Sequence, residues 1–542
     1  MNYNQTAMAN QKLTASLPQR SPWGEFKNEP FTDFKTPENA AAMQAALAAV
    51  ATQLGREYDL IVGGQRIKTD GKIRSVNPAR PAQLVGIHQK AEAGQVEQVM
   101  SAALCSFDGW KRVSVEERAE LLINVARIIR KRHFEFCAWL TFETGKNWAE
   151  ADADVGETLD FLEFYAREAL RLANSKTSIQ YPGERCELHY IPLGVGAVIP
   201  PWNFPFAIMA GMTSAAVVAG NTVILKPSSD APTIAAKFME VLEEAGMPAG
   251  VVNFCPGSGS TFGNALVEHP KTRFISFTGS KAVGLEIHER AAKPQKGQIW
   301  IKRTVLEMGG KDSMLICADA NLDAAADAVT AAAFGFSGQK CSACSRAIVE
   351  APVYDAFVEK LLARVAKLTV GDPVSNHNLG PVINKAALDS ILKYIEIGKK
   401  EGKLLVGGKA PAIEGGYFIE PTVFGEIAPD AKLSQEEVFG PVLALIKVPN
   451  FDAGLQVANN TEYGLTGSIY STDRAKLDRA REEFHVGNLY FNRKCTGAMV
   501  GAHPFGGFNM SGTDSKAGGA DYLLLFTQSK SVAETLGAAA AR

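Results

Sequence analysis

The chain has 542 residues, of which 46% are hydrophobic and 21% are charged. This composition is typical of a globular protein and excludes disordered, collagenous and coiled-coil classes. Its 56 basic and 58 acidic residues give a net charge of −2, so no overall field attracts nucleic acid or an anionic membrane. The length predicts three to four domains, or fewer and larger α/β domains. Eight thinly spread cysteines, and an N-terminal segment without the apolar core of a signal peptide, favour a cytoplasmic protein.

The N-terminal third is predicted to be mostly helical. After an irregular arm over residues 1–40, apolar residues recur at helical spacing in Asn39–Leu54, Ser114–Phe136 and Asn147–Ala173. The later run Leu188–Leu225 contains no Asp, Glu, Lys or Arg. Its prolines and asparagines would leave backbone groups unpaired in lipid, so we expect no membrane span.

Short β-branched runs then alternate with helical stretches, which predicts a doubly wound parallel sheet. The predicted strands are Val195–Ile199, Thr222–Leu225, Val251–Phe254 and Phe274–Phe277. A second alternating series begins near Val305 and predicts a second α/β domain, with a boundary near residue 306. Its predicted helix is Asn321–Phe336, and its predicted strands are Ser313–Ile316, Ala347–Val349, Val442–Val448, Gly467–Tyr470 and Asn488–Phe491.

Two segments fit neither series. Ser175–Tyr190 and Tyr522–Val532 alternate polar and apolar residues, as exposed hairpins and strands do. Unpaired strand edges of this kind often join another subunit.

The most informative chemical feature is a thiol in a glycine-flanked loop, Phe336-Ser-Gly-Gln-Lys-Cys341-Ser-Ala-Cys344-Ser-Arg346. A loop thiol on a rigid scaffold is suited to act as a nucleophile, and we expect Lys340 and Arg346 to favour its thiolate form. The alternatives are a redox pair with Cys344 and an inert buried cysteine. No second cluster of Cys or His completes a zinc site, so we expect no metal.

A carboxylate and an amide are the next candidates. Glu307, in Val305-Leu-Glu-Met-Gly-Gly-Lys311, ends an apolar run, where desolvation would raise its pKa into the range of a general base. A turn or cap residue is the other interpretation of this glutamate. Asn203, in Pro200-Pro-Trp-Asn-Phe-Pro205, offers an N–H donor to a developing oxyanion.

Ligand-binding signals follow two predicted strands. In Phe277-Thr-Gly279-Ser280-Lys-Ala-Val-Gly284 a strand leads into a helix, whose first N–H groups and dipole would hold a pyrophosphate. Lys226 follows the strand Thr222–Leu225, at the carboxyl end where ligands bind in such sheets.

From about residue 25 to 530 the chain resembles the aldehyde dehydrogenases, because that family's motifs occur here in the family's order. The motifs are Pro201-Trp-Asn-Phe-Pro205, Lys226-Pro227, Phe277-Thr-Gly-Ser280 with Gly284, Leu306-Glu-Met-Gly-Gly310, Gly338-Gln-x-Cys341 and Glu436-Glu-Val-Phe-Gly-Pro441. The resemblance implies a Rossmann-like NAD domain, a second α/β catalytic domain and a small β-flap that makes the chain at least a homodimer. We expect the NAD domain and its helical arm at 1–174 and 191–306, the catalytic domain at 307–517 and the flap at 175–190 and 518–532.

The resemblance also implies oxidation of an aldehyde to an acid. Cys341 would attack the aldehyde carbon, Asn203 and the N–H of Cys341 would hold the oxyanion, and Glu307 would activate the hydrolytic water. Where Ser229 stands, many family members carry a Glu that repels a 2′-phosphate, so NAD is expected and NADP stays possible. The implied cofactor-binding residues are Trp202, Lys226, Ser229, Gly279, Ser280, Gly284, Glu437 and Phe439.

Three segments, Phe26–Phe34, Gly338–Arg346 and Thr496–Gly507, resemble the family members that oxidise L-glutamate γ-semialdehyde, formed from 1-pyrroline-5-carboxylate, to glutamate in proline degradation. Another semialdehyde, such as succinic semialdehyde, is the alternative substrate, and a binding or scaffold protein is the alternative class. Glu157 would meet the substrate's ammonium group or lie on a solvated helix face. The implied substrate-binding residues are Glu157, Phe204, Ser342, Thr496, Gly497, Ala498 and Phe505.

Overall fold

The computed structural model describes residues 22–173 and 179–537. An arm without helix or strand, residues 22–36, leads into the first helix. The predicted helix Ser114–Phe136 is wrong at its end, because the backbone leaves helical geometry at Arg132 (φ −106°, ψ 21°) and a new helix begins at His133. The N-terminal helices are α1 (Pro37–Ala51), α2 (Val96–Trp110), α3 (Val115–Lys131), α4 (His133–Thr144) and α5 (Trp148–Ala173).

The N-terminal third is mostly helical, as predicted, but five short strands that were not predicted lie between α1 and α2. They are β1 (Arg56–Tyr58), β2 (Leu60–Val62), β3 (Gln65–Ile67), β4 (Lys72–Asn77) and β5 (Arg80–Gln89). Strands β1, β5 and β4 form a small sheet, whereas β2 pairs with a strand nearly 200 residues later in the chain. Strand β3 pairs with β2 and β4 pairs with β5 in local hairpins, and β1, β2 and β3 each span three residues, which is too short for periodicity to identify them.

The first large sheet has the order β11-β10-β7-β8-β9-β2-β3, and its first five strands are parallel. On β7, Val198 packs into one hydrophobic cluster and Ala197 into another, so the sheet is buried on both faces. This confirms the doubly wound prediction. Its elements are β7 (Val195–Ile199), α6 (Ala207–Val218), β8 (Thr222–Leu225), α7 (Thr233–Glu244), β9 (Val252–Phe254), α8 (Asn264–Glu268), β10 (Phe274–Thr278), α9 (Lys281–Ala292) and β11 (Arg303–Glu307).

The second large sheet has the order β14-β15-β16-β13-β12-β18-β19 and is parallel except at β14. The second series was predicted to begin near Val305, but β11, which contains Val305, closes the first sheet, so the second begins at β12. Its strands are β12 (Ser313–Ile316), β13 (Arg346–Glu350), β14 (Lys403–Val406), β15 (Thr422–Gly425), β16 (Val442–Val448), β18 (Thr466–Tyr470) and β19 (Asn488–Phe491). Its helices are α10 (Leu322–Phe334), α11 (Tyr354–Val365), α12 (Lys385–Glu401), α13 (Lys432–Gln435), α14 (Phe451–Asn459) and α15 (Arg474–Glu483). Two further short strands, β17 (Tyr463–Gly464) and β20 (Phe508–Asn509), form a separate antiparallel pair outside this sheet.

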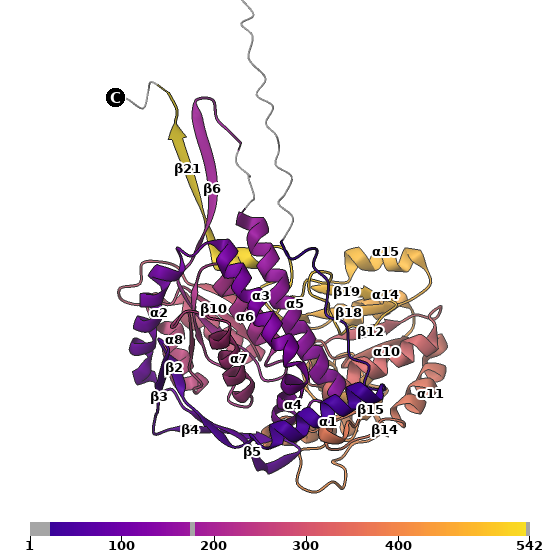
Figure 1. Cartoon of the computed structure of the whole chain (residues 1–542). Coiled ribbons are helices and arrows are strands. Elements are labelled where there is room, and N and C mark those ends of the chain that lie inside the picture. Colours follow the sequence, from indigo (N-terminus) through magenta and orange to yellow (C-terminus); the bar gives the residue numbers. More distant parts are fainter. Residues whose placement is uncertain (1–21, 174–178, 538–542) are drawn as a thin grey trace, which may run out of the picture.

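A two-stranded ribbon projects from the body of the molecule (Figure 1). It consists of β6 (Glu184–Pro192) and β21 (Thr527–Thr535), paired antiparallel from Thr527 opposite Pro192 to Thr535 opposite Glu184. The predicted strand Tyr522–Val532 is wrong in its first half, since Tyr522–Phe526 forms a 3₁₀ turn buried in the main core. Part of the predicted segment Ser175–Tyr190 lies outside the described residues. Within residues 22–173 and 179–537, no helix combines the length and apolarity needed to cross a bilayer.

Candidate active site

A cavity of about 410 Å³ collects residues from the arm, from α5 and from the loops that follow β7, β11, α10 and β19. The predicted nucleophile Cys341 and the predicted base Glu307 both line it. The predicted substrate-binding residues in its wall are Glu157, Phe204, Ser342, Gly497, Ala498 and Phe505. Residues separated by more than 300 positions in sequence therefore face one space.

The loop before Cys341 has a strained backbone. Phe336 (φ 48°), Ser337 (φ 54°) and Gly338 (φ 71°) are consecutive left-handed residues, an arrangement that surrounding contacts must enforce. A Cβ atom at Gly338 would lie 2.2 Å from the carbonyl oxygen of Gly440, so only glycine allows this approach. The buried Gln339 fixes the loop from within, accepting a hydrogen bond from the main-chain N–H of residue 383 (2.8 Å).

The expectation that Lys340 and Arg346 favour a thiolate is wrong. Lys340 forms an ion pair with Glu150 (2.6 Å), and the Arg346 guanidinium donates to main-chain carbonyl groups, including that of Lys311 (3.0 Å). Burial raises the pKa of the Cys341 thiol, and the surrounding carboxylates raise it further. These surroundings therefore favour the neutral thiol over the thiolate.

Asn203 lies beside the nucleophile loop on the segment between β7 and α6. Its side chain is 4% exposed, and Nδ2 donates to the carbonyl oxygen of Gln339 (3.1 Å). An amide nitrogen carries two hydrogens, so the second remains for another acceptor. Asn203 does not itself line the 410 Å³ cavity, so its role at an oxyanion next to Cys341 stays a prediction.

Glu307 is the last residue of β11 and does not cap a helix. Its Oε1 accepts a hydrogen bond from the Ser515 hydroxyl, whereas Oε2, although buried, has no hydrogen-bond partner among the described residues. Burial raises its pKa to about 8, against the lowering effect of the Ser515 hydrogen bond. Such a carboxyl group has the basicity required of a general base near neutral pH.

The predicted pyrophosphate site is a strand-to-helix turn at the carboxyl end of β10. Ser280 caps α9, its hydroxyl accepting from the N–H of Val283 (3.5 Å), and the N–H of Gly279 donates to the carbonyl oxygen of Glu307 (3.0 Å). A Cβ atom at Gly284 would lie 2.5 Å from the sulfur of Met308, so glycine permits close packing of α9. The turn thus joins the predicted cofactor edge directly to the predicted base.

Lys226 follows β8 at the same edge and is 6% exposed. Burial lowers its pKa to about 8, and its ammonium donates to one acceptor, the carbonyl oxygen of Pro227 (3.2 Å). A buried ammonium with three donors calls for further acceptors, such as the hydroxyl groups of a ribose. Ser229, three residues after Lys226 in the segment that follows β8, is exposed.

Glu437 and two aromatic residues complete this edge. Glu437 Oε1 accepts from the N–H of Gly310 (2.9 Å), and burial raises its pKa to about 6. Phe439 adopts φ 56°, and its ring meets that of Trp202 edge to face at 5.5 Å. The predicted cofactor residues of both sheets are therefore brought together, although the 410 Å³ cavity does not include them.

The predicted anchor for the substrate carboxylate is the turn at Thr496, Gly497 and Ala498. Gly497 has φ 76°, and Arg493 donates to the carbonyl oxygens of Thr496 (3.1 Å) and Gly497 (2.8 Å). These bonds turn the carbonyl groups toward Arg493. Gly497 and Ala498 face the cavity, whereas Thr496 is 3% exposed and does not line it.

Glu157 lies in the cavity wall, so its alternative position on a solvated helix face is wrong. Burial and, to a smaller extent, the neighbouring Asp154 carboxyl group together raise its pKa to about 8. The charged residues of its helix suggested a solvated face, but the fold places Glu157 in the cavity wall, where it is half-buried.

A buried ion pair behind the site was not predicted from the sequence. Lys146 Nζ contacts Asp154 Oδ2 (2.8 Å), and both side chains are inaccessible to solvent. The ammonium lies 3.8 Å from the ring centroid of Phe204 and 4.8 Å from that of Phe336. Cation–π contact at these distances joins the Asn203 segment to the Cys341 loop. The pair depends on tertiary contacts and leaves no motif in the sequence.

The N-terminal arm covers the outer part of the cavity, which its residues Glu29, Phe31 and Thr32 help to line. Two buried carboxylates of α5 hold it. Asp160 Oδ1 accepts from the N–H of Glu29 (2.7 Å), and Asp152 accepts from the N–H (2.9 Å) and hydroxyl (2.5 Å) of Thr32.

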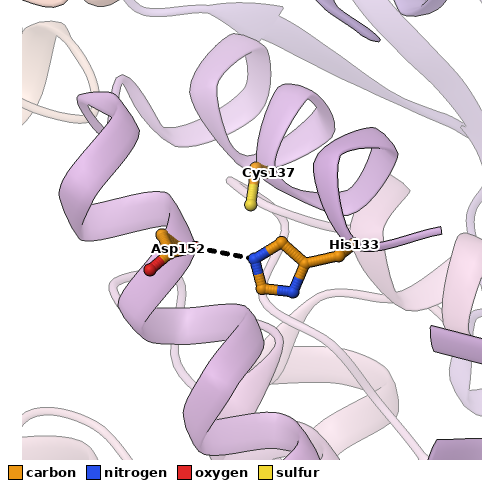
Figure 2. A group of neighbouring side chains, drawn as sticks. All are labelled: His133, Cys137 and Asp152. Atoms are coloured by element: carbon orange, nitrogen blue, oxygen red, sulfur yellow. Dashed lines mark hydrogen bonds and ion pairs between the residues drawn. The ribbon is translucent and has the colours of Figure 1, made fainter. Parts of the chain in front are cut away.

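Asp152 also accepts a hydrogen bond from His133 Nε2 (2.7 Å), and Cys137 lies beside this pair on α4 (Figure 2). The ligand atoms of the three residues lie within 4.8 Å of one another, as in a loose metal site. However, both Asp152 oxygens already accept protein donors, and burial raises the pKa of the Cys137 thiol well above its ordinary value. We interpret the cluster as structural, because its hydrogen bonds join the N-terminal arm to α4 and α5.

Comparisons with known proteins agree with this geometry. Residues 66–532 match the aldehyde dehydrogenase family. Relatives named 1-pyrroline-5-carboxylate dehydrogenase from Geobacillus thermodenitrificans and Bacillus subtilis are 56% and 55% identical over 510 residues, which is 94% of this chain and 99% of each relative. A solved structure of 1-pyrroline-5-carboxylate dehydrogenase from Thermus with bound NAD has a TM-score of 0.93 and 50% identity, covering 94% of this chain and 99% of that one. The chain belongs to the aldehyde dehydrogenase family.

Proposed function

We propose that this chain oxidises L-glutamate γ-semialdehyde, the open form of 1-pyrroline-5-carboxylate, to L-glutamate with NAD, as a step of proline degradation. The observation that carries the proposal is one cavity lined by Cys341, by Glu307 and by a turn at Gly497 and Ala498 suited to a carboxylate. A thiol, a base and an anion anchor are the groups that this oxidation requires. The names of close relatives support the same substrate.

In the proposed mechanism the Cys341 thiol gives up its proton to water as its sulfur forms a bond to the aldehyde carbon, and the electrons of the C=O π bond move onto the oxygen. The free N–H of the Asn203 amide and the main-chain N–H of Cys341 stabilise the negative charge that develops on the oxygen. NAD, when bound, supplies the acceptor for the hydride that leaves this carbon, and a thioester on Cys341 remains. Glu307 then takes a proton from water, the water oxygen forms the new C–O bond, and the C–S bond breaks to release the acid and restore the thiol.

The substrate's charged end would bind other residues of the cavity wall. Main-chain N–H groups of the turn that carries Gly497 would bind the α-carboxylate, because Arg493 occupies the carbonyl groups of that turn. Ser342 and Phe505 line the space between, where the hydroxyl and the ring would contact the substrate. Glu157 would ionise when the substrate's ammonium group approaches, because an opposite charge lowers a carboxyl pKa.

A comparison of three aldehydes tests this function. Purified protein with NAD should form NADH from glutamate semialdehyde with a kcat/KM at least about tenfold above that for succinic semialdehyde or propanal, since only the first satisfies both charged anchors. A preference for succinic semialdehyde would support the runner-up substrate. Absence of NADH with all three would contradict the enzyme assignment and favour a scaffold protein.

The choice of cofactor gives a separate prediction. By the family resemblance, the exposed Ser229 would lie near the adenosine ribose, where it carries no charge that repels a 2′-phosphate, so the wild-type protein should use NADP measurably as well as NAD. Ser229→Glu should lower kcat/KM with NADP by about tenfold or more and change kcat/KM with NAD little, because a carboxylate repels a 2′-phosphate. Ser229→Gln, similar in size but uncharged, is the matched control. Equal losses in both variants would indicate a steric cause.

We also propose that the β6–β21 ribbon joins subunits. An isolated two-stranded ribbon is marginal in water, and both outer edges of this one are free for pairing within the described residues. Static light scattering should give at least twice the monomer mass of 58.1 kDa, and a monomeric mass would contradict the proposal.

We propose a cytoplasmic location for the chain, because all eight cysteines are free, as is usual in a reducing compartment. Cell fractionation would test this location.

A further inference from the structure

Ser515 contacts the predicted general base from outside the cavity. Its side chain is 4% exposed, and its hydroxyl donates to Glu307 Oε1. Ser515 does not line the cavity that holds Cys341, so it is placed to act on Glu307 and not on a substrate.

The backbone around Ser515 is strained. Asp514 (φ 53°) and Lys516 (φ 45°), on either side of it, are both left-handed residues other than glycine. Such residues cost free energy and persist where surrounding contacts enforce them, commonly at functional sites. Here Lys516 Nζ provides the constraint, donating to the carbonyl oxygens of Gly487 (2.8 Å) and Gly506 (2.6 Å).

Two glycines, one on each side of β20, lie against the Glu307 carboxylate. A Cβ atom at Gly506 would lie 3.0 Å from Glu307 Oε1, and one at Gly512 would lie 3.3 Å from Oε2. Gly512 also forms a β-bridge with Glu307. The loop therefore encloses the carboxylate closely, with the Ser515 hydroxyl as its side-chain donor and Oε2 left without a partner.

We propose that Ser515 is a positioning residue for the general base, anchoring Oε1 of Glu307 so that Oε2 is the oxygen that takes the proton from the hydrolytic water. This inference rests on the proposed function in assigning hydrolysis to Glu307. A hydroxyl that donates to a carboxylate stabilises the ionised form and restricts rotation of the side chain. Loss of the hydroxyl therefore has two consequences, a less well oriented base and a higher pKa.

The test follows hydrolysis of the acylated enzyme. Ser515→Ala should slow this step by about tenfold, and the acid limb of its pH profile should move upward by about one pH unit, because a charge-assisted hydrogen bond is lost. Formation of the acyl-enzyme should be unchanged, since Cys341 is not altered. Ser515→Thr, which keeps the hydroxyl, should restore both the rate and the pH profile.

Ser511→Ala is the matched control for loosening of the loop. Ser511 is fully buried in the same loop, but its hydroxyl accepts from the N–H of Gly464 (3.0 Å) and does not reach Glu307. We expect this variant to keep the acid limb of the wild type. Thermal unfolding midpoints of all three variants show which of them are folded well enough for comparison.

Two substrates separate this inference from the proposed function. Glutamate semialdehyde with NAD reports the burst and the steady rate of NADH formation. An activated ester, p-nitrophenyl acetate, acylates the thiol without either ligand. The burst of p-nitrophenol reports acylation, and the steady release that follows it reports hydrolysis of the acyl-enzyme. If the wild type fails with the semialdehyde but Ser515→Ala shifts ester hydrolysis, the substrate assignment is wrong and the inference stands. If Ser515→Ala leaves the acid limb unmoved with both substrates, or Ser511→Ala moves it equally, the inference is overturned.

Discussion

Cys341→Ala should abolish NADH formation from glutamate semialdehyde, by about 10⁴-fold or more, because no other group replaces a covalent nucleophile. The side chain is small and borders a cavity, so its loss removes little packing. Circular dichroism and binding of NAD should therefore match the wild type. Steady-state NADH absorbance measures the loss.

Cys344→Ala is the control for this variant, because Cys344 lies in the same loop but packs with 1% exposure into the hydrophobic cluster behind the second sheet. Its Sγ donates to the carbonyl oxygen of Arg346 (3.5 Å) and faces no ligand space. We expect a modest loss of stability and retained oxidation. Equal inactivation by the two substitutions would favour a redox pair, and an active Cys341→Ala would refute the covalent mechanism.

The buried strands were predictable where the segment is a continuous run of apolar residues. Val195–Ile199 and Thr222–Leu225 are strands at the predicted residues, because both are short apolar runs buried on both faces. The five N-terminal strands were not predicted. Strand β2, for example, spans only Leu60–Val62, which is too short for a period to be recognised, and it pairs locally with β3 as well as with Phe254 on β9.

The residues of the candidate site also fall into two groups, those that a sequence motif identifies and those that only the fold brings to the site. The sequence predicted Cys341, Glu307 and Asn203 because each lies in a motif with glycine or proline at fixed positions. Such a glycine can be required because a side chain would collide with a neighbouring atom, as it would at Gly338. Ser515 carries no comparable signal, since a serine between charged residues resembles an exposed turn. Its function arises only where the loop after β20 folds back over the end of β11.

Electrostatic expectations failed where sequence neighbours were assumed to be neighbours in space. Lys340 and Arg346 flank the nucleophile in sequence, yet each turns toward another partner. The groups that shift the thiol pKa come from four other segments, and they are the carboxylates of Asp312, Glu437, Glu307 and Glu157. The site therefore contains more carboxyl groups than its motif suggests. The pKa of the Cys341 thiol depends more on burial than on the charges next to it in the sequence.

Glu307→Gln should separate the two halves of the reaction. Glutamine keeps the shape of the side chain but accepts no proton, so hydrolysis of the thioester should slow by about 10²- to 10⁴-fold. The first turnover should still release about one NADH per subunit, because hydride leaves before Glu307 acts as base.

In the wild type the burial that raises the Glu307 pKa to about 8 keeps the carboxyl protonated and inactive below that pH. Steady-state turnover should therefore rise as pH increases through about 8, whereas the burst in Glu307→Gln should lack this limb. Stopped-flow absorbance across the pH range measures both phases. Loss of the burst in a folded Glu307→Gln protein would place Glu307 before hydride departure, as the base that deprotonates Cys341.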